Sequence, residues 1–294
     1  MKRIIFLLLL CLAANIFMCG CCIYQVKFTH PIKCVSHRGE EFDAPEASAP
    51  AFKLAMQKKA DIVKLDIQFT GDRIVVLSHD PTLTRMMNWN VKVENVTLAE
   101  IKKRKFINVG GYANEKLLTL REGLEIVKDC PEFWIDFKAF SPEIFEKTIA
   151  EFDRLKISHD RLMVATFSLP AIEYALKNYP EIRRVNHISI IQQLDNTHTG
   201  SFFPEHSRTP EDIIKHLLAR RDRYKLHGFN MPVYGLRKGF LTTEMIQELR
   251  KNGVWCSVYY VHNAKAAEIR GVTSADAFVT GRISEVRPYC RRDN

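Results

Sequence analysis

Two histidines that each follow an apolar run are the first candidates for chemistry. His37 follows residues 32–36 and precedes Arg38, and His79 follows a second such run and precedes Asp80. Imidazole suits proton transfer because its unperturbed pKa is about 6.5, and the Arg38 guanidinium can direct two N–H groups at one phosphate. These residues predict acid/base chemistry on a phosphate-bearing substrate. The remaining histidines lack such partners and are treated as background.

Charged side chains also alternate with apolar ones inside two runs that otherwise have the character of strands. In residues 63–69 the period is two, so Lys64 and Asp66 share one face. Asp136 and Lys138 share a face in the same way. Strands of a parallel sheet that is covered on both sides are normally apolar, and ionisable residues near their carboxyl ends usually take part in chemistry. We therefore expect these four side chains at the same site as the histidines.

The elements that must position these residues form one repeating pattern. Expected strands are 32–36, 62–70, 133–137, 162–166, 185–191, 228–232, 254–261 and 277–280. Expected helices are 51–58, 98–103, 120–128, 142–155, 170–177, 210–220 and 242–251. Strands that alternate with helices indicate parallel βαβ units, and eight strands in about 260 residues match a (β/α)8 barrel. We predict an α/β TIM barrel in a single domain over residues 32–290.

An extra strand over residues 74–79 does not fit this alternation. Only residues 70–73 separate it from the preceding strand, which is too short for a parallel crossover and predicts a hairpin. Folding the hairpin about positions 72 and 73 is expected to place Asp66 opposite His79.

The N-terminal residues 1–22 are expected to lie outside this domain. Lys2 and Arg3 precede the unbroken apolar run 4–14, the pattern of a secretory signal or an uncleaved membrane anchor. Met18-Cys19-Gly20-Cys21 resembles a loose lipobox, in which Cys21 follows the small residue and would carry the lipid, so lipidation is a third alternative. All three predict an exported protein, in the periplasm or on the outer surface. An uncleaved anchor or a lipid would also tether it to a membrane surface through this segment.

The net charge narrows the kinds of molecule that the protein is expected to bind. The 294 residues include 43 Lys and Arg against 34 Asp and Glu, a formal net charge of +9, which suits an anionic partner. Nucleic acid is not expected, because the sequence has no zinc-finger pattern, RNP motif or long basic run.

Cys34 and Cys290 are candidates for a disulfide in an oxidising compartment. Buried free thiols at all four cysteines after residue 22 are the favoured alternative.

Several of these motifs together resemble the glycerophosphodiester phosphodiesterases. The resemblance runs from about residue 32 to residue 288 and rests on five ordered motifs: His37-Arg38-Gly39, Ala44-Pro45-Glu46, Asp66, His79-Asp80 and Asp136-Phe137-Lys138. It implies a TIM barrel of the phospholipase C-like class. It also implies hydrolysis of a glycerophosphodiester or lysophospholipid to a glycerol phosphate and an alcohol, usually with calcium or magnesium.

The resemblance also implies roles for individual residues. His37 and His79 correspond to an acid/base pair. A glycerol hydroxyl attacks the phosphorus, the alcohol leaves, and water opens the cyclic phosphate, while the two imidazoles exchange proton donor and acceptor roles. Arg38 and Lys138 correspond to residues that hold the phosphate oxygens.

The implied metal site is where this sequence departs from the family. Its ligands, if a metal binds, would be Glu46, Asp66 and Asp136. The family usually has Glu where this chain has Lys64 and where it has Asp136, and it often has Asp where this chain has Gly281. Asp for Glu keeps a hard oxygen ligand, whereas an ammonium at 4 Å from a divalent ion is repelled by roughly 8 kcal/mol at an effective dielectric near 20.

Three interpretations of Lys64 follow. In the first, its ammonium takes the cation's place and neutralises the phosphate, so that catalysis needs no metal. In the second, Lys64 turns aside and a weaker calcium or magnesium site persists. In the third, the protein is a catalytically inactive binder of phosphate or phospholipid headgroups on the same barrel. Retention of both histidines favours an enzyme.

Overall fold

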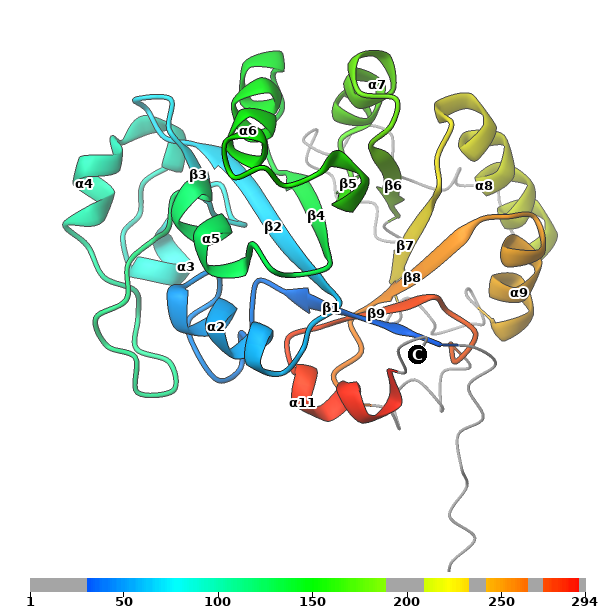
Figure 1. The fold of residues 1–294 in the computed structure, drawn as a ribbon, viewed down its shortest axis with the longest axis horizontal. Coiled ribbons are helices and arrows are strands. Elements are labelled where there is room, and N and C mark those ends of the chain that lie inside the picture. The colour runs from blue at the N-terminus through cyan, green and yellow to red at the C-terminus, as the bar shows by residue number, and fades with distance from the viewer. Residues whose placement is uncertain (1–30, 189–208, 233–241, 264–271, 291–294) are drawn as a thin grey trace, which may run out of the picture.

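The structure, a computed structural model, describes residues 31–188, 209–232, 242–263 and 272–290. Its sheet runs in the order β1-β9-β8-β7-β6-β5-β4-β2-β3, and a further pairing of β1 with β2 closes eight parallel strands into a barrel (Figure 1). The barrel strands are β1 (Lys33–His37), β2 (Ile62–Phe69), β4 (Glu132–Phe137), β5 (Leu162–Thr166), β6 (Arg183–His187), β7 (Gly228–Pro232), β8 (Trp255–Tyr259) and β9 (Ala277–Thr280). The predicted (β/α)8 fold is confirmed.

The helices lie outside this ring of strands (Figure 1). They are α2 (Ala49–Gln57), α5 (Leu120–Val127), α6 (Pro142–Arg154), α7 (Leu169–Asn178), α8 (Pro210–Tyr224), α9 (Thr243–Lys251) and α11 (Ile283–Val286). Ser141 and Thr209 accept hydrogen bonds from backbone N–H groups of the first turns of α6 and α8, each of which begins at a proline. Pro170 was expected to begin its helix but is the second residue of α7, because Ser168 caps one residue earlier than expected.

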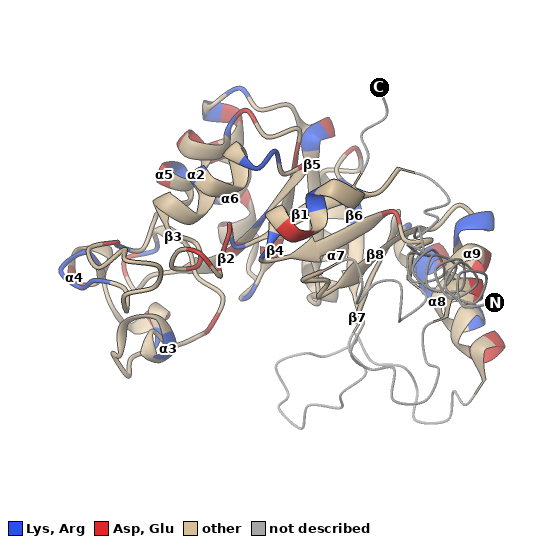
Figure 2. Cartoon of the chain, turned by 90° about the horizontal axis from the view of Figure 1, so that it is seen from below, with Lys and Arg blue, Asp and Glu red and all other residues tan. Residues whose placement is uncertain are grey.

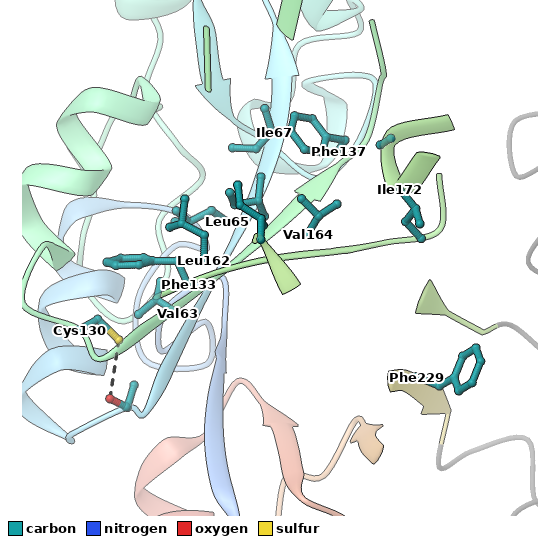
Figure 3. Close-up of a cluster of buried hydrophobic side chains, with 14 of the residues drawn as sticks. Val63, Leu65, Ile67, Cys130, Phe133, Phe137, Leu162, Val164, Ile172 and Phe229 are labelled. Atoms are coloured by element: carbon teal, nitrogen blue, oxygen red, sulfur yellow. Dashed lines mark hydrogen bonds between the residues drawn. The ribbon is translucent and has the colours of Figure 1, made fainter. Parts of the chain in front are cut away.

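Two cores hold the barrel together, one on each face of the strands. Figure 3 shows part of the outer core, where Val63, Leu65 and Ile67 of β2 pack with residues of β4, β5 and α7. The inner core fills the barrel with Val35, Ile62, Trp134, Met163, Ala165, Val185, Ala277 and Val279. Odd-numbered residues of β2 thus face the helices and even-numbered residues face the barrel interior. This is why Lys64 and Asp66 point inwards.

The extra strand is shorter than expected, and its register differs. Strand β3 (Val75–Leu77) pairs antiparallel with β2, with Phe69 opposite Val75. Thr70 N–H donates to Ile74 O at 3.0 Å, so the turn is centred on Asp72. Asp66 therefore lies opposite Ser78 and not opposite His79 as predicted. The half-residue error in the turn's centre displaced the partner by one position.

The chain between β3 and α5 makes an excursion outside the barrel. It carries α3 (Thr84–Met87), η1 (Val93–Asn95) and α4 (Leu98–Lys102). A second apolar cluster stabilises it, formed by Val76, Leu83, Met86, Met87, Val93, Val96, Ile101, Phe106 and Leu117. Thr97 and Glu100 form a capping box at the start of α4. The excursion therefore has its own small core beside β3.

The predictions for the N-terminal segment and for the cysteines can also be compared with the structure. The signal or anchor predicted for residues 1–22 lies outside the described residues, and within those residues no helix is long and apolar enough to cross a bilayer. Cys34, Cys130, Cys256 and Cys290 are buried free thiols, so the Cys34–Cys290 bridge is not formed. Acidic and basic residues occur together on α8 and α9 (Figure 2).

Candidate active site

A pocket lies at the mouth of the barrel. Each of the eight barrel strands contributes to it, either through one of its own residues or through the residue that follows. The lining is His37, Lys64, His79, Asp136, Lys138, Phe167, His187, Asn230, Tyr259, Tyr260 and Val279, around an empty volume of about 290 Å³ that is partly open to solvent. Five of the eight predicted site residues are therefore brought together, as expected of the carboxyl ends of barrel strands.

His37 is the last residue of β1 and is almost fully buried. Its Nδ1 lies 2.7 Å from Oε1 of Glu41, its ring packs 4.5 Å from that of Tyr260, and its Nε2 has no hydrogen-bond partner. Burial, together with the charges of Arg38 and Lys64, holds the pKa of His37 well below its usual value. A neutral imidazole with an unpaired Nε2 at a pocket can accept a proton.

His79 reaches the same pocket from the end of the hairpin. Its Nδ1 lies 2.7 Å from Asp80, whose other oxygen accepts a hydrogen bond from Arg85 Nε at 2.6 Å. Burial and Lys138 lower the pKa of His79, although the hydrogen bond to Asp80 opposes them. The hydrogen bonds from His79 and Arg85 hold the pKa of Asp80 below its usual range. Each of the two histidines thus has Nδ1 on a carboxylate.

Lys64 points into the site and not away from it. Its ammonium contacts Asp66 and lies 2.8 Å from Oδ2 of Asp136. Burial alone would lower the pKa of Lys64, but Asp136 and Asp66 outweigh it, and the pKa is raised. Burial would likewise raise the pKa of Asp66, but Lys138 and Lys64 hold it well below its usual range. Lys64 is therefore a charged ammonium between two ionised carboxylates at neutral pH.

Lys138 joins the same charge cluster. Its Nζ donates to Asp136 Oδ2 at 2.7 Å and lies 3.4 Å from Asp66 Oδ1. Register explains the meeting, since Asp66 of β2 pairs directly with Asp136 of β4. Two ammonium groups and two carboxylates thus share one wall of the pocket.

Arg38 and Glu46 lie beside the pocket and do not line it. Arg38 Nε donates to Asp66 at 3.1 Å, and its Nη1 donates to Glu46 at 2.9 Å. Arg85 donates from both terminal nitrogens to the two oxygens of Glu46, at 2.7 and 2.8 Å. The predicted contact of Arg38 with substrate phosphate stays a prediction.

The residues of the site that were missed in the sequence include two ionisable side chains. His187, the last residue of β6, is buried, and its Nε2 lies 3.6 Å from Asp136 and has no hydrogen-bond partner. Ser257 donates to Asn230 Oδ1 at 2.8 Å, which leaves the Asn230 amide to donate to His187 Nδ1 at 2.7 Å. Nε2 of His187 therefore carries its proton towards the pocket. The other missed residue is Glu41, the partner of His37.

Comparison with known proteins identifies the family of this chain. Residues 37–284 match the sequence profile of the Glycerophosphoryl diester phosphodiesterase family. The chain belongs to this family. It is therefore a phosphoric diester hydrolase of the glycerophosphodiester class.

Individual relatives lead to the same family. A glycerophosphodiester phosphodiesterase of Caldanaerobacter subterraneus is 27% identical over 253 residues, 84% of this chain and 92% of the relative. Glycerophosphodiester phosphodiesterase 1 of Homo sapiens is 31% identical over 157 residues, 50% of this chain and 45% of that protein. Among solved structures, an Oleispira antarctica phosphodiesterase in complex with sn-glycerol-3-phosphate has a TM-score of 0.71 at 19% identity. That match covers 88% of this chain and 96% of the other.

The residues expected to hold the family's metal do not fit one in this chain. Within the described ranges, no three His, Cys, Asp or Glu side chains are grouped so that they could hold a metal ion. Asp66 and Asp136 are neutralised by Lys64 and Lys138, and Glu46 is bound by two guanidinium groups. A divalent cation would have to displace the Lys64 ammonium and would be repelled by it. The predicted set of Glu46, Asp66 and Asp136 is therefore a set of ion-pair partners in this structure.

Proposed function

We propose that this family hydrolase cleaves glycerophosphodiesters with His37 and His79 as the acid/base pair and with Lys64 in place of a divalent cation. The observation that carries the proposal is the shared pocket, which both imidazoles and the Lys64 and Lys138 side chains line. A phosphodiester carries one negative charge. The buried ammonium of Lys64 and the partly buried ammonium of Lys138 offer charge-assisted hydrogen bonds to its oxygens.

The reaction proceeds in two steps that balance in protons. One imidazole removes the proton of the glycerol hydroxyl next to the phosphate while that oxygen attacks phosphorus. The other imidazole protonates the leaving alcohol. A cyclic phosphate remains, and water opens it with the two histidines in exchanged roles, which restores both to their first state. Lys64 and Lys138 stabilise the extra charge that develops on the phosphoryl oxygens in each transition state.

The substrate we propose is a small glycerophosphodiester or a lysophospholipid. The Oleispira antarctica phosphodiesterase, which shares the fold, holds sn-glycerol-3-phosphate. The same product follows from the reaction proposed for this chain.

The decisive experiment measures release of sn-glycerol 3-phosphate from glycerophosphodiesters in excess chelator. We expect turnover without added metal, and a fall of at least about 100-fold in kcat for Lys64→Met. Lys92→Met is the matched control, because Lys92 is exposed and does not line the pocket. Turnover only with calcium or magnesium would show that Lys64 does not replace the cation. Binding of inorganic phosphate without cleavage of any diester would support the inactive-binder alternative.

We also propose that residues 1–22 export the protein and tether it to a membrane surface. The charged start and the apolar run 4–14 support this. Fractionation of cells that express the full chain tests it, with Cys21→Ala as the variant that separates lipidation from an uncleaved anchor. Recovery of the full chain in the soluble cytoplasmic fraction would contradict the proposal.

A further inference from the structure

The contact between His37 and Glu41 places a partly buried carboxylate directly behind a histidine that lines the pocket. Glu41 Oε1 lies 2.7 Å from His37 Nδ1, and the two side chains are only 16% and 4% exposed. The opposite nitrogen of the ring, Nε2, is buried without a partner. The arrangement holds one ring nitrogen on a carboxylate and presents the other to the pocket.

The neighbouring residue fixes the loop that carries Glu41. Glu40 is fully buried, and its Oε2 accepts a hydrogen bond from the backbone N–H of Ile283 at 2.9 Å, at the start of α11. Its Oε1 accepts from Lys58 Nζ at 2.8 Å. The loop after β1 is thus tied to α2 and α11 one residue before Glu41, which limits the positions that the Glu41 side chain can take.

Gly281 supplies the space that the Glu41 side chain fills. A Cβ atom on Gly281 would lie 2.4 Å from Glu41 Oε1 and 2.5 Å from Glu41 Cγ, both far inside contact distance. Gly281 is not among the glycines with positive φ, so its backbone does not itself require glycine. Its lack of a side chain has a steric consequence, and the atoms concerned are those of Glu41.

We infer that Glu41 is a positioning residue for His37, and that glycine at position 281 is what allows it to be one. Ionised Glu41 accepts the Nδ1–H of His37, so the Nε2 lone pair faces the pocket as the general base. When Nε2 takes the proton, the nearby carboxylate stabilises the imidazolium. The inference rests on the proposed function for its catalytic meaning and adds a residue that no family motif of this chain contains.

The charges around the pair are mixed in sign. Burial raises the pKa of Glu41 to about 7; Arg38 and Lys64 oppose this rise, while Glu46 and Asp66 add to it. His37 faces Arg38, Lys64, Asp66 and His79. Glu41 is therefore ionised at pH 8.5, which sets the condition for the experiments below.

The kinetic test is a double-mutant cycle at pH 8.5. Glu41→Ala is expected to lower kcat by about 10- to 1,000-fold with KM changed less than twofold, below the roughly 10⁴-fold loss on neutralising the carboxylate behind a serine protease histidine. Gly281→Ala is expected to lower kcat to a similar degree in the wild-type background. In the Glu41→Ala background it is expected to have no effect, because the atoms that it would meet are gone.

Asp43→Asn is the matched control. It removes a carboxylate from the same loop, but Asp43 is exposed and pairs with Lys58, not with His37. It is expected to leave kcat unchanged. Equal losses from Gly281→Ala in both backgrounds, or an unchanged kcat in Glu41→Ala, would overturn the inference.

A spectroscopic test separates this inference from the proposed function. Nitrogen-15 NMR of the His37 ring at pH 8.5 is expected to show the Nδ1–H tautomer in wild type and the Nε2–H tautomer in Glu41→Ala. If wild type cleaves no diester but shows this change, the proposed function fails and the positioning role stands. If the tautomer is the same in both proteins, the positioning role fails whether or not the protein is active.

Discussion

The Lys64 ammonium of β2 lies 2.8 Å from the Asp136 carboxylate of β4, and it contacts Asp66 at the same time. The register that places Asp66 opposite Asp136 makes this meeting unavoidable. The site thus contains a buried cation held by two anions, and its stability depends on both signs of charge being present.

Lys64→Met is expected to lower the free energy of unfolding by about 3 kcal/mol. Removing one partner of a buried ion pair leaves the other charges uncompensated, which typically costs 3–5 kcal/mol. The lower end applies because Lys138 and Arg38 still contact Asp66. Urea denaturation at pH 7 measures the change, with Lys92→Met as the control. Equal stability of the two variants would show that Lys138 and Arg38 suffice to neutralise the carboxylates.

His79→Ala is expected to abolish turnover without unfolding the protein. The imidazole is partly exposed at the pocket, so its removal leaves no large cavity, while loss of an acid/base group costs about 10²- to 10⁴-fold in rate. Turnover and circular dichroism are measured together. His216→Ala on α8 is the control, because His216 is exposed and does not line the pocket. Loss of the folded spectrum in His79→Ala would identify a structural histidine instead.

His187 predicts a loss of stability as the pH falls from about 6.5 to 4. Burial lowers the pKa of His187 to about 4 in the folded protein, so below 6.5 the unfolded chain binds the proton more readily. The contribution is fully present above pH 6.5 and declines as the pH falls towards 4, by about 3 kcal/mol in total.

Unfolding free energies of wild type and His187→Gln between pH 7 and 4 check this effect. The variant cannot take up the proton, so its stability should fall less steeply and the difference between the two proteins should shift by about 3 kcal/mol. Parallel curves would mean that His187 does not titrate differently on folding.

Gly39→Ala is expected to destabilise the protein and to lower kcat. Gly39 has a φ of +88° and a built Cβ would lie 2.6 Å from the backbone of Ala51 in α2. Gly111→Ala is a matched control, since Gly111 has a φ of +85° and open space around it. We expect a cost of about 1 kcal/mol for Gly111→Ala, from the backbone alone, and a clearly larger one for Gly39→Ala. Thermal melts measure the loss of stability in each variant, and steady-state kinetics measures kcat. Equal losses of stability in the two variants would show that α2 moves to accommodate the added methyl group.

The sequence pattern was sufficient for the barrel because its strands are short, largely apolar runs, and most of them are separated by helices such as α6 and α8, which have clear start signals. The inward face of β2 also followed from the period of two, which correctly paired Lys64 with Asp66. The hairpin register did not follow, because it depends on the turn's backbone. Arg73 adopts a φ of +62°, and the turn centres on Asp72. No residue type in the turn announces that choice.

His187 and Glu41 were missed for a different reason. The run 185–191 was interpreted as one strand, which hid that β6 ends at His187. Asn230, the partner of His187, and Ser257, which donates to Asn230, come from strands far along the chain. Glu41 lies in a loop, where no periodicity marks orientation. The one sequence signal for His187 would have been its position as the last residue of a strand, and the predicted strand 185–191 extended past it.

Arg85 links the excursion outside the barrel to the candidate active site. The Arg85 guanidinium forms salt bridges with both Glu46 and Asp80, and Asp80 contacts Nδ1 of His79. Changes to the surface between β3 and α5 that remove or displace Arg85 would consequently alter the position of Asp80 and, through it, of His79. Loop grafting between relatives should preserve activity when it retains Arg85 and forfeit it when it does not, even if the transplanted segment never approaches a substrate.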